Sequence, residues 1–150
     1  MTTKAAVEDF LAQRTLAVVG VSRDSRKFGN VIFKDLKKKG YRVYPINPNA
    51  QSIEGEPCYS NLASLPEKVG GVILVLPPAK SAQVVREAKA AGIERVWLQQ
   101  GAESREALEF CQQNGISVVA GECILMFARP IGFFHKPHRW VWGLMGKLPQ

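Results

Sequence analysis

Short apolar blocks recur along the whole chain, and Gly or Pro separates most of them from the next block. Compact apolar runs of this length are typical of strands that are covered on both faces of a sheet, whereas the run after Gly40 alternates until it meets Pro48. The pattern predicts five strands, over residues 16–20, 41–47, 71–76, 95–101 and 116–121, the third of them stopped by Pro77 and Pro78.

Between these strands the apolar positions follow helical spacing. Val7, Phe10 and Leu11 are spaced i, i+3, i+4 and predict a short amphipathic helix before the first strand. The helix after the first strand turns large apolar residues inward and stops at Gly40, a residue type favoured at helix C-caps. The remaining pattern places helices over residues 29–40, 81–91 and 103–114, with a shorter one within residues 60–66.

The alternation of strands and helices predicts an α/β fold, a Rossmann-like doubly wound parallel sheet of about five strands in three layers. A length of 150 residues with 46% hydrophobic content suits one domain over residues 1–150, in which residues 129–150 form a basic aromatic C-terminal tail. The common strand order 3-2-1-4-5 places the chain reversal between the first and fourth strands. Ligands of such sheets lie over the carboxyl ends of the strands at the reversal.

Charge and cysteine content narrow the class of protein. A net charge of +7 favours an acidic ligand, a nucleic acid or an anionic surface. Cys58, Cys111 and Cys123 are an odd number at spacings that match neither a zinc site nor a disulfide framework, and no secretory signal precedes Thr15. No apolar run approaches the length of a membrane helix. We therefore expect a soluble protein of the reducing cytoplasm.

The loop after the first strand is the main candidate for chemistry. Gly20 ends the strand, and Ser22, Arg23 and Lys27 precede Gly29 at the start of the next helix. Backbone amides at a helix start, together with such cations, suit a phosphate group. The alternative is a plain turn with solvated basic residues.

An NAD site normally has an acidic residue after the second strand, to bind the ribose hydroxyls. Here that place holds Asn47 and Pro48. The missing carboxylate and the basic loop weigh against a nicotinamide cofactor, although an Asn is able to contact a ribose.

Six segments between Val18 and Met126 stand out together, namely VVGVSRDSRKFGN, GYRVYPINP, GEPCYSNLASLP, GVILVLPP, RVWLQQGAES and VVAGECILM. In this order they resemble the small stand-alone CoA-binding domain proteins, which are similar to the CoA-binding amino-terminal domain of the succinyl-CoA synthetase alpha subunit. The resemblance implies a Rossmann-type domain with coenzyme A, or an acyl-CoA, as its cofactor.

The resemblance also implies which residues form the site. The groups around the diphosphate would be held by the first loop, namely Gly20, Val21, Ser22, Lys27, Phe28, Gly29 and Asn30. The adenosine side would be lined by Asn47, Pro48, Leu76, Pro77 and Pro78. The path toward the pantetheine would be bordered by Gln99, Gln100 and Gly101.

The chain departs from the synthetase pattern in its carboxyl-terminal part. The synthetase uses a phosphorylated histidine in a further domain, whereas His135 and His138 lie in the tail outside any such motif. Proline between these two histidines disfavours a helical metal pair, and no catalytic set of carboxylates or Ser/His/Asp residues is found, so we expect no metal site and no catalytic residues. The tail favours self-association or packing on the domain over a membrane surface, with nucleic acid least favoured.

Three functional hypotheses follow. The first is a domain that binds CoA or an acyl-CoA without transforming it, as a sensor, carrier or regulatory subunit. The second is an enzyme, either an NAD(P)-dependent reductase or part of an acyl-CoA ligase whose catalytic part is another chain. The third is a redox-responsive protein in which Cys123 forms a mixed disulfide with CoA, against the simpler interpretation of Cys123 as a buried strand-exit residue.

Overall fold

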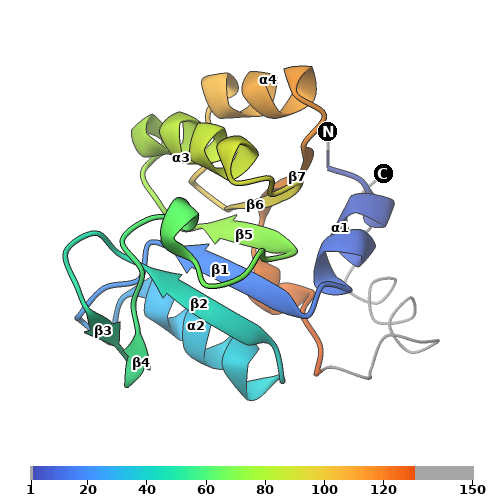
Figure 1. Cartoon of the computed structure of the whole chain (residues 1–150). Coiled ribbons are helices and arrows are strands. Elements are labelled where there is room, and N and C mark those ends of the chain that lie inside the picture. The colour runs from blue at the N-terminus through green and yellow to red at the C-terminus, as the bar shows by residue number, and fades with distance from the viewer. Residues whose placement is uncertain (1, 131–150) are drawn as a thin grey trace.

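A computed structural model describes residues 2–130, and its main sheet has five parallel strands (Figure 1). The bounds of these strands are β1 Thr15–Val19, β2 Arg42–Ile46, β5 Gly71–Leu74, β6 Arg95–Gln99 and β7 Ser117–Glu122. They lie in the order β2-β1-β5-β6-β7, with every neighbouring pair parallel. The predicted α/β, doubly wound architecture is confirmed.

Helices cover both faces of this sheet and complete the three layers (Figure 1). Their bounds are α1 Lys4–Leu11, α2 Phe28–Lys38, α3 Pro78–Ala90 and α4 Arg105–Gln113, with 3-10 turns η1 Leu62–Ser64 and η2 Ile124–Met126. One face packs against α1, α2 and η2, and the other against α3, α4 and η1. α3 begins at Pro78 rather than at the predicted Ser81, since Pro is well tolerated at the first helical position.

The predicted strand order is wrong. β1 pairs with β2 on one side and with β5 on the other, so the chain reverses between the first and third of the predicted strands. β5 is buried at all four positions and needs an interior place, whereas β2 exposes Arg42 and contains Pro45. Pro has no N–H for a ladder hydrogen bond and is confined to edge strands, which places β2 at the edge.

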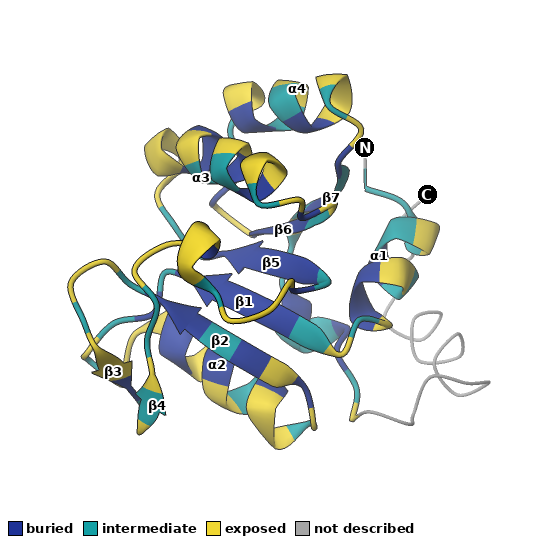
Figure 2. Cartoon of the chain, viewed as in Figure 1, coloured by how far each residue is buried: buried dark blue, intermediate teal, exposed yellow. Residues whose placement is uncertain are grey.

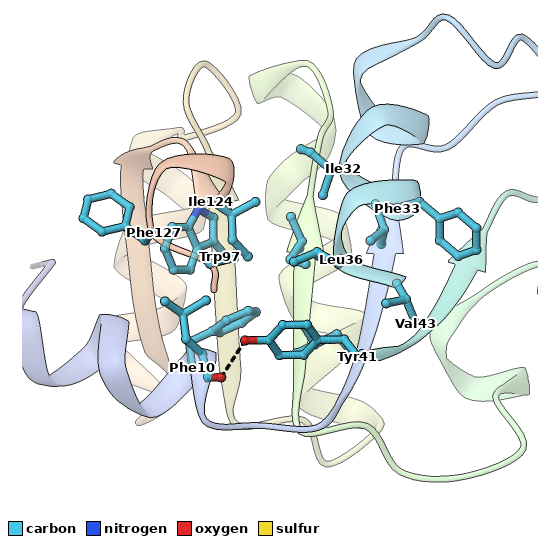
Figure 3. Packing of buried hydrophobic residues seen from close by; sticks show 14 of the residues in the cluster. Phe10, Ile32, Phe33, Leu36, Tyr41, Val43, Trp97, Ile124 and Phe127 are labelled. Atoms are coloured by element: carbon cyan, nitrogen blue, oxygen red, sulfur yellow. Dashed lines mark hydrogen bonds between the residues drawn. The ribbon is translucent and has the colours of Figure 1, made fainter. Parts of the chain in front are cut away.

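Alternating side chains of the strands belong to two separate hydrophobic clusters, one on each face of the sheet. Figure 2 shows that the strands of the sheet are mostly buried. Trp97 of β6 is the largest fully buried side chain and points to the α1 and α2 face. Phe10 of α1 meets its ring edge-on at a centroid distance of 5.3 Å, and Phe127 lies on it at 6.2 Å (Figure 3). The Trp97 Nε1–H donates to the Glu122 carbonyl at 3.0 Å. This hydrogen bond satisfies the buried indole N–H and connects β6 to β7.

A small antiparallel hairpin interrupts the connection from β2 to η1, and it was not predicted from the sequence. Its strands are β3 Ser52–Ile53 and β4 Glu56–Pro57. Glu54 and Gly55 form the two-residue turn with φ of 53° and 76°, the positive values that such a turn requires. The hairpin brings Glu54 to the start of α2, where its side chain becomes part of the candidate site.

Candidate functional site

The turn from β1 into α2 is built on two close backbone approaches that only glycine permits. Gly20 has a φ of +117°, and a Cβ atom there would meet the Val75 carbonyl oxygen at 2.1 Å. A Cβ on Gly29 would meet the Gly20 carbonyl oxygen at 2.3 Å. The two glycines therefore let β1, the end of β5 and the first turn of α2 converge at the point where the strand order reverses, the place where open α/β sheets bind ligands.

Asn30 fixes the main chain of the loop. Its side chain is fully buried, and its Oδ1 accepts from the Ser22 N–H at 2.7 Å while its Nδ2 donates to the Ser22 carbonyl at 2.7 Å. The same Nδ2 donates to Glu54 Oε2 at 2.9 Å, and the Lys34 ammonium lies 3.8 Å from that oxygen. Because each polar atom of the buried amide is used, the conformation of Ser22 is set before any ligand arrives.

Asn47 connects the end of β2 to the same loop. Its Nδ2 donates to the Val21 carbonyl at 2.9 Å, and its Oδ1 accepts from the Asn49 N–H at 2.7 Å. Both ends of the amide are therefore engaged by main-chain groups. Asn47 acts as a brace between two strand ends.

The start of α2 is electropositive and uncapped. Lys27 is its N-cap residue and makes no side-chain cap hydrogen bond, and the first turn contains no acidic residue. Within residues 2–130, no hydrogen bond is made by the amides of Phe28 and Gly29. Unpaired amides at the positive end of a helix dipole are the groups that hold a phosphate.

The cations of the loop differ in their availability. Arg26 is paired with Asp24 at 3.0 Å, and hydrogen bonds from Arg26 lower the pKa of that carboxyl group below its ordinary value. The side chains of Arg23 and Lys27 are exposed, and neither forms an ion pair in the part of the chain that the structure describes. Neither cation is held by an ion pair there, although the Lys27 charge contributes, after the Arg26 hydrogen bonds, to the lowered pKa of Asp24.

A cavity of about 370 Å³ opens beside α3, on the face of the sheet that α3, α4 and η1 cover. The residues at the ends of β1 and β2 and just after β5 form its floor. The turn around η1 and one side of α3 form its walls. It is lined by Val19, Ile46, Pro48, Ser60, Asn61, Leu62, Leu76, Lys80, Val84 and Glu87. Its floor is apolar, which suits a flat ring or an aliphatic chain.

The end of β6 makes contacts of a different kind. Gln99 is only 2% exposed, and its Oε1 accepts from the Ile124 N–H at 3.1 Å, which positions η2. Gln100 and Gly101 are exposed in the turn that follows, where the Gly101 N–H donates to Glu103 Oε2 at 3.0 Å. No contact described between residues 2 and 130 joins these three residues to the Gly20 loop.

The predicted site residues thus fall into separate groups. Direct contacts connect Gly20, Val21, Ser22, Gly29, Asn30 and Asn47. Lys27 and Phe28 lie exposed at the helix start, and Phe28 is 47% exposed. The cavity takes in Pro48 and Leu76, whereas Pro77 and Pro78 begin α3 on the surface.

Sequence reasoning missed two residues, Glu54 and Lys80. The Glu54–Gly55 pair carries a weak turn signal, but nothing in the sequence shows that the turn folds back onto Asn30. Lys80 follows Pro77 and Pro78, and an earlier helix start at Pro78 would have placed it on the first turn of α3.

The three cysteines are free thiols in different surroundings. Cys111 is fully buried, and burial raises the pKa of its thiol to about 11. Cys58 is half-buried, its Sγ lies 3.7 Å from the Asn47 carbonyl, and burial raises its pKa as well. Cys123 is half-buried just before η2, and its reactivity toward a CoA thiol stays a prediction.

Among residues 2–130, no three His, Cys, Asp or Glu side chains gather as metal ligands, and no helix is long and apolar enough to cross a membrane. His135, His138 and the aromatic part of the tail lie outside the described residues, so self-association through the tail stays a prediction.

Comparison with known proteins connects this geometry to a family. The CoA binding domain family model matches residues 14–129, which include every element from β1 to η2. The chain is 28% identical over 130 residues to acetate–CoA ligase (ADP-forming) I of Archaeoglobus fulgidus, covering 80% of this chain and 19% of the ligase. It is 28% identical over 126 residues to the alpha subunit of acetate–CoA ligase (ADP-forming) II of Pyrococcus furiosus, covering 77% of this chain and 28% of the subunit.

A smaller protein of known structure has a similar fold. A conserved hypothetical protein from Pyrococcus furiosus superposes with a TM-score of 0.72 at 43% identity, covering 75% of this chain and 97% of that one. The chain therefore matches a small part of the ligases and nearly the whole of this smaller protein. By its sequence over residues 14–129, the chain belongs to the CoA binding domain family and is related to the ADP-forming acetate–CoA ligases.

Proposed function

We propose that the chain binds CoA or an acyl-CoA at the crevice between β1 and β5, without transforming it, as a sensor, carrier or regulatory subunit in the cytoplasm. The observation that carries the proposal is the uncapped start of α2 beside Gly20, in a chain whose family is the CoA binding domain. In this proposal the amides of Phe28 and Gly29 hold the diphosphate, and Lys27 adds a full positive charge.

The proposal divides the ligand between the two sides of the crevice. The diphosphate lies over the Gly20 turn, and the adenosine enters the cavity that Pro48 and Leu76 line. The pantetheine runs along the end of β6, past Gln100 and Gly101, which are exposed there. Gln99 supports this path indirectly because it holds η2.

The residue at the end of β2 favours CoA over a nicotinamide cofactor. A dinucleotide site of the NAD type presents a carboxylate at the end of the second strand, where it binds the ribose hydroxyls. Here that position is Asn47, and both ends of its amide are occupied by the Val21 carbonyl and the Asn49 N–H. Asn47 is a neutral amide and supplies no carboxylate to accept from both ribose hydroxyls, so nicotinamide cofactors are disfavoured.

A thermal-shift titration tests the proposal. A ligand that binds only the folded state raises Tm by mass action, so CoA should raise Tm more than NAD or NADP at equal concentration. The charge reversal Lys27→Glu should weaken CoA binding about tenfold or more, because it replaces a cation at the diphosphate with an anion.

Lys38→Glu is the matched control for that variant, since Lys38 is exposed in the last turn of the same helix. It makes the same change in net charge far from the crevice and should leave CoA affinity nearly unchanged. An equal or larger response to NAD than to CoA would contradict the proposal.

A second candidate is a part of an acyl-CoA ligase whose catalytic part is another chain. The relation to ligases of which this chain spans 19% and 28% favours it. The chain purified from its source with any accompanying chain would be assayed for ATP-dependent acyl-CoA formation. Turnover that depends on the accompanying chain supports a ligase part, and CoA binding with no turnover supports the binding function.

A further inference from the structure

The cavity beside α3 has opposite charges at its two ends. Lys80, Val84 and Glu87 line it from one surface of the helix. Residues seven apart on a helix are separated by two turns, roughly 10 Å. α3 begins where β5 ends, so Lys80 lies near the carboxyl ends of the strands and Glu87 lies farther from the crevice.

Lys80 is the one cation that lines this cavity among the residues described. Its main-chain N–H donates to the Pro77 carbonyl at 2.9 Å, which belongs to the first turn of the helix. Its ammonium group has no ion pair within residues 2–130, in contrast to Arg86 on the same helix, which binds Glu106 at 2.7 Å. The charge of Lys80 is therefore available to a ligand in the cavity.

The apolar residues between the two charged ends suit an adenine ring. Ile46, Leu76 and Val84 are among the apolar residues that line the cavity, and they offer surface for a flat ring. The Glu87 carboxylate repels a phosphate from the far end, since like charges destabilise each other. A phosphorylated adenosine is thereby oriented with its phosphate at the Lys80 end.

We propose that Lys80 is a specificity-determining residue that binds the 3′-phosphate of the CoA ribose, while the adenine lies in the cavity beside α3. This inference rests on the proposed CoA-binding function. CoA carries a diphosphate and a separate 3′-phosphate, and the cations of the β1 loop lie over the first of these. Lys80 supplies the second phosphate with a cation from a different element, so the site distinguishes CoA from a nucleotide that lacks the 3′-phosphate.

Isothermal titration of the full chain with CoA and with dephospho-CoA, which lacks only the 3′-phosphate, tests this inference. The unmodified chain should prefer CoA about tenfold, the effect of one hydrogen bond to a charged group. Lys80→Gln should bind CoA about tenfold more weakly, bind dephospho-CoA unchanged and so lose the preference. Lys89→Gln is the matched control, because Lys89 lies on the same helix and donates to the Asn114 carbonyl, away from the cavity.

The possible outcomes separate this inference from the proposed function. If CoA binds and Lys80→Gln retains the full preference over dephospho-CoA, the assignment of Lys80 is wrong while CoA binding stands. An equal affinity of the unmodified chain for both compounds overturns the assignment in the same way. If neither compound binds the unmodified chain, the proposed function itself is overturned, and the assignment of Lys80 with it.

Discussion

Gly20 is the residue on which the geometry of the crevice depends most directly. Gly20→Ala combines a positive φ with a Cβ placed 2.1 Å from the Val75 carbonyl oxygen, so β1 and the end of β5 would have to separate. We expect a loss of about 3 kcal/mol or more in the free energy of unfolding, measured by urea denaturation.

Gly101→Ala is the matched control for that substitution. Gly101 also has a positive φ, +94°, but a Cβ there meets nothing within 4 Å. The free energy of unfolding of Gly101→Ala should therefore fall only through backbone strain, by about 1 to 2 kcal/mol. Equal losses for the two variants would show that the approach of β1 to β5 does not limit stability at Gly20.

Single residues of the site could be predicted unevenly from the sequence. Gly20 and Asn47 lie at predicted strand ends, and the resemblance to the CoA-binding domain proteins placed both of them and Asn30 in the candidate site. The structure joins the three through contacts of the loop. Glu54 and Lys80 could not be found in this way. Their positions depend on how a hairpin folds back and how a helix packs beside a cavity, which short sequence patterns do not encode.

At the scale of elements, Tyr41 joins α1 to the turn that leads into β2. Its hydroxyl is buried and donates to the Leu11 carbonyl at 2.8 Å (Figure 3). Tyr41→Phe leaves that carbonyl unpaired and should lower the free energy of unfolding by about 1 to 2 kcal/mol. Tyr59→Phe is the control, because the Tyr59 hydroxyl makes no hydrogen bond within residues 2–130, and it should change stability little.

Tyr41 should also make the stability of the fold depend on pH. Burial raises the pKa of Tyr41 in the folded state above its ordinary value. Above about pH 10 the unfolded chain releases this proton while the folded chain keeps it, so stability present below that pH is lost as the pH rises. Urea denaturation at pH 9 to 11, about the ordinary tyrosine pKa, should show a shallower decline for Tyr41→Phe. If the free energy of unfolding declines with pH equally steeply in Tyr41→Phe and in the unmodified chain, Tyr41 is not the cause of the decline.

The elements themselves were largely predictable, whereas their order in the sheet was not. Each main strand and helix follows a local pattern of apolar spacing with Gly or Pro at its end, and all of them appear in the structure. The order was predicted from the commonest topology, which overlooked Pro45 in β2. That one residue argues against an interior position for the strand, because it cannot donate a ladder hydrogen bond.

At the scale of the whole molecule, the two cores determine which thiols are accessible. Cys111 is fully buried between α4 and the sheet, and its pKa is raised to about 11. Iodoacetamide should therefore label Cys123 and Cys58 of the native protein before Cys111, which should react only when the domain opens. Peptide mass spectrometry over time measures the order. Labelling of Cys111 as fast as Cys123 in native buffer would contradict the described packing.

The segment that matches the family also contains the whole candidate site. Residues 14–129 match the CoA binding domain family, and the same residues contain the reversal of strand order, the Gly20 turn and the cavity beside α3. An isolated loop of this kind would be a weak indication of a phosphate site. In this chain the loop, the uncapped helix start and the cavity all lie at the same end of the sheet, and together they favour a site for CoA.

The most direct test of the account is a crystal structure of the full chain with CoA. We predict that the diphosphate lies within hydrogen-bonding distance of the amides of Phe28 and Gly29, with the adenine beside Leu76. Density for CoA at another face of the molecule, or an empty crevice at saturating CoA, would contradict the account.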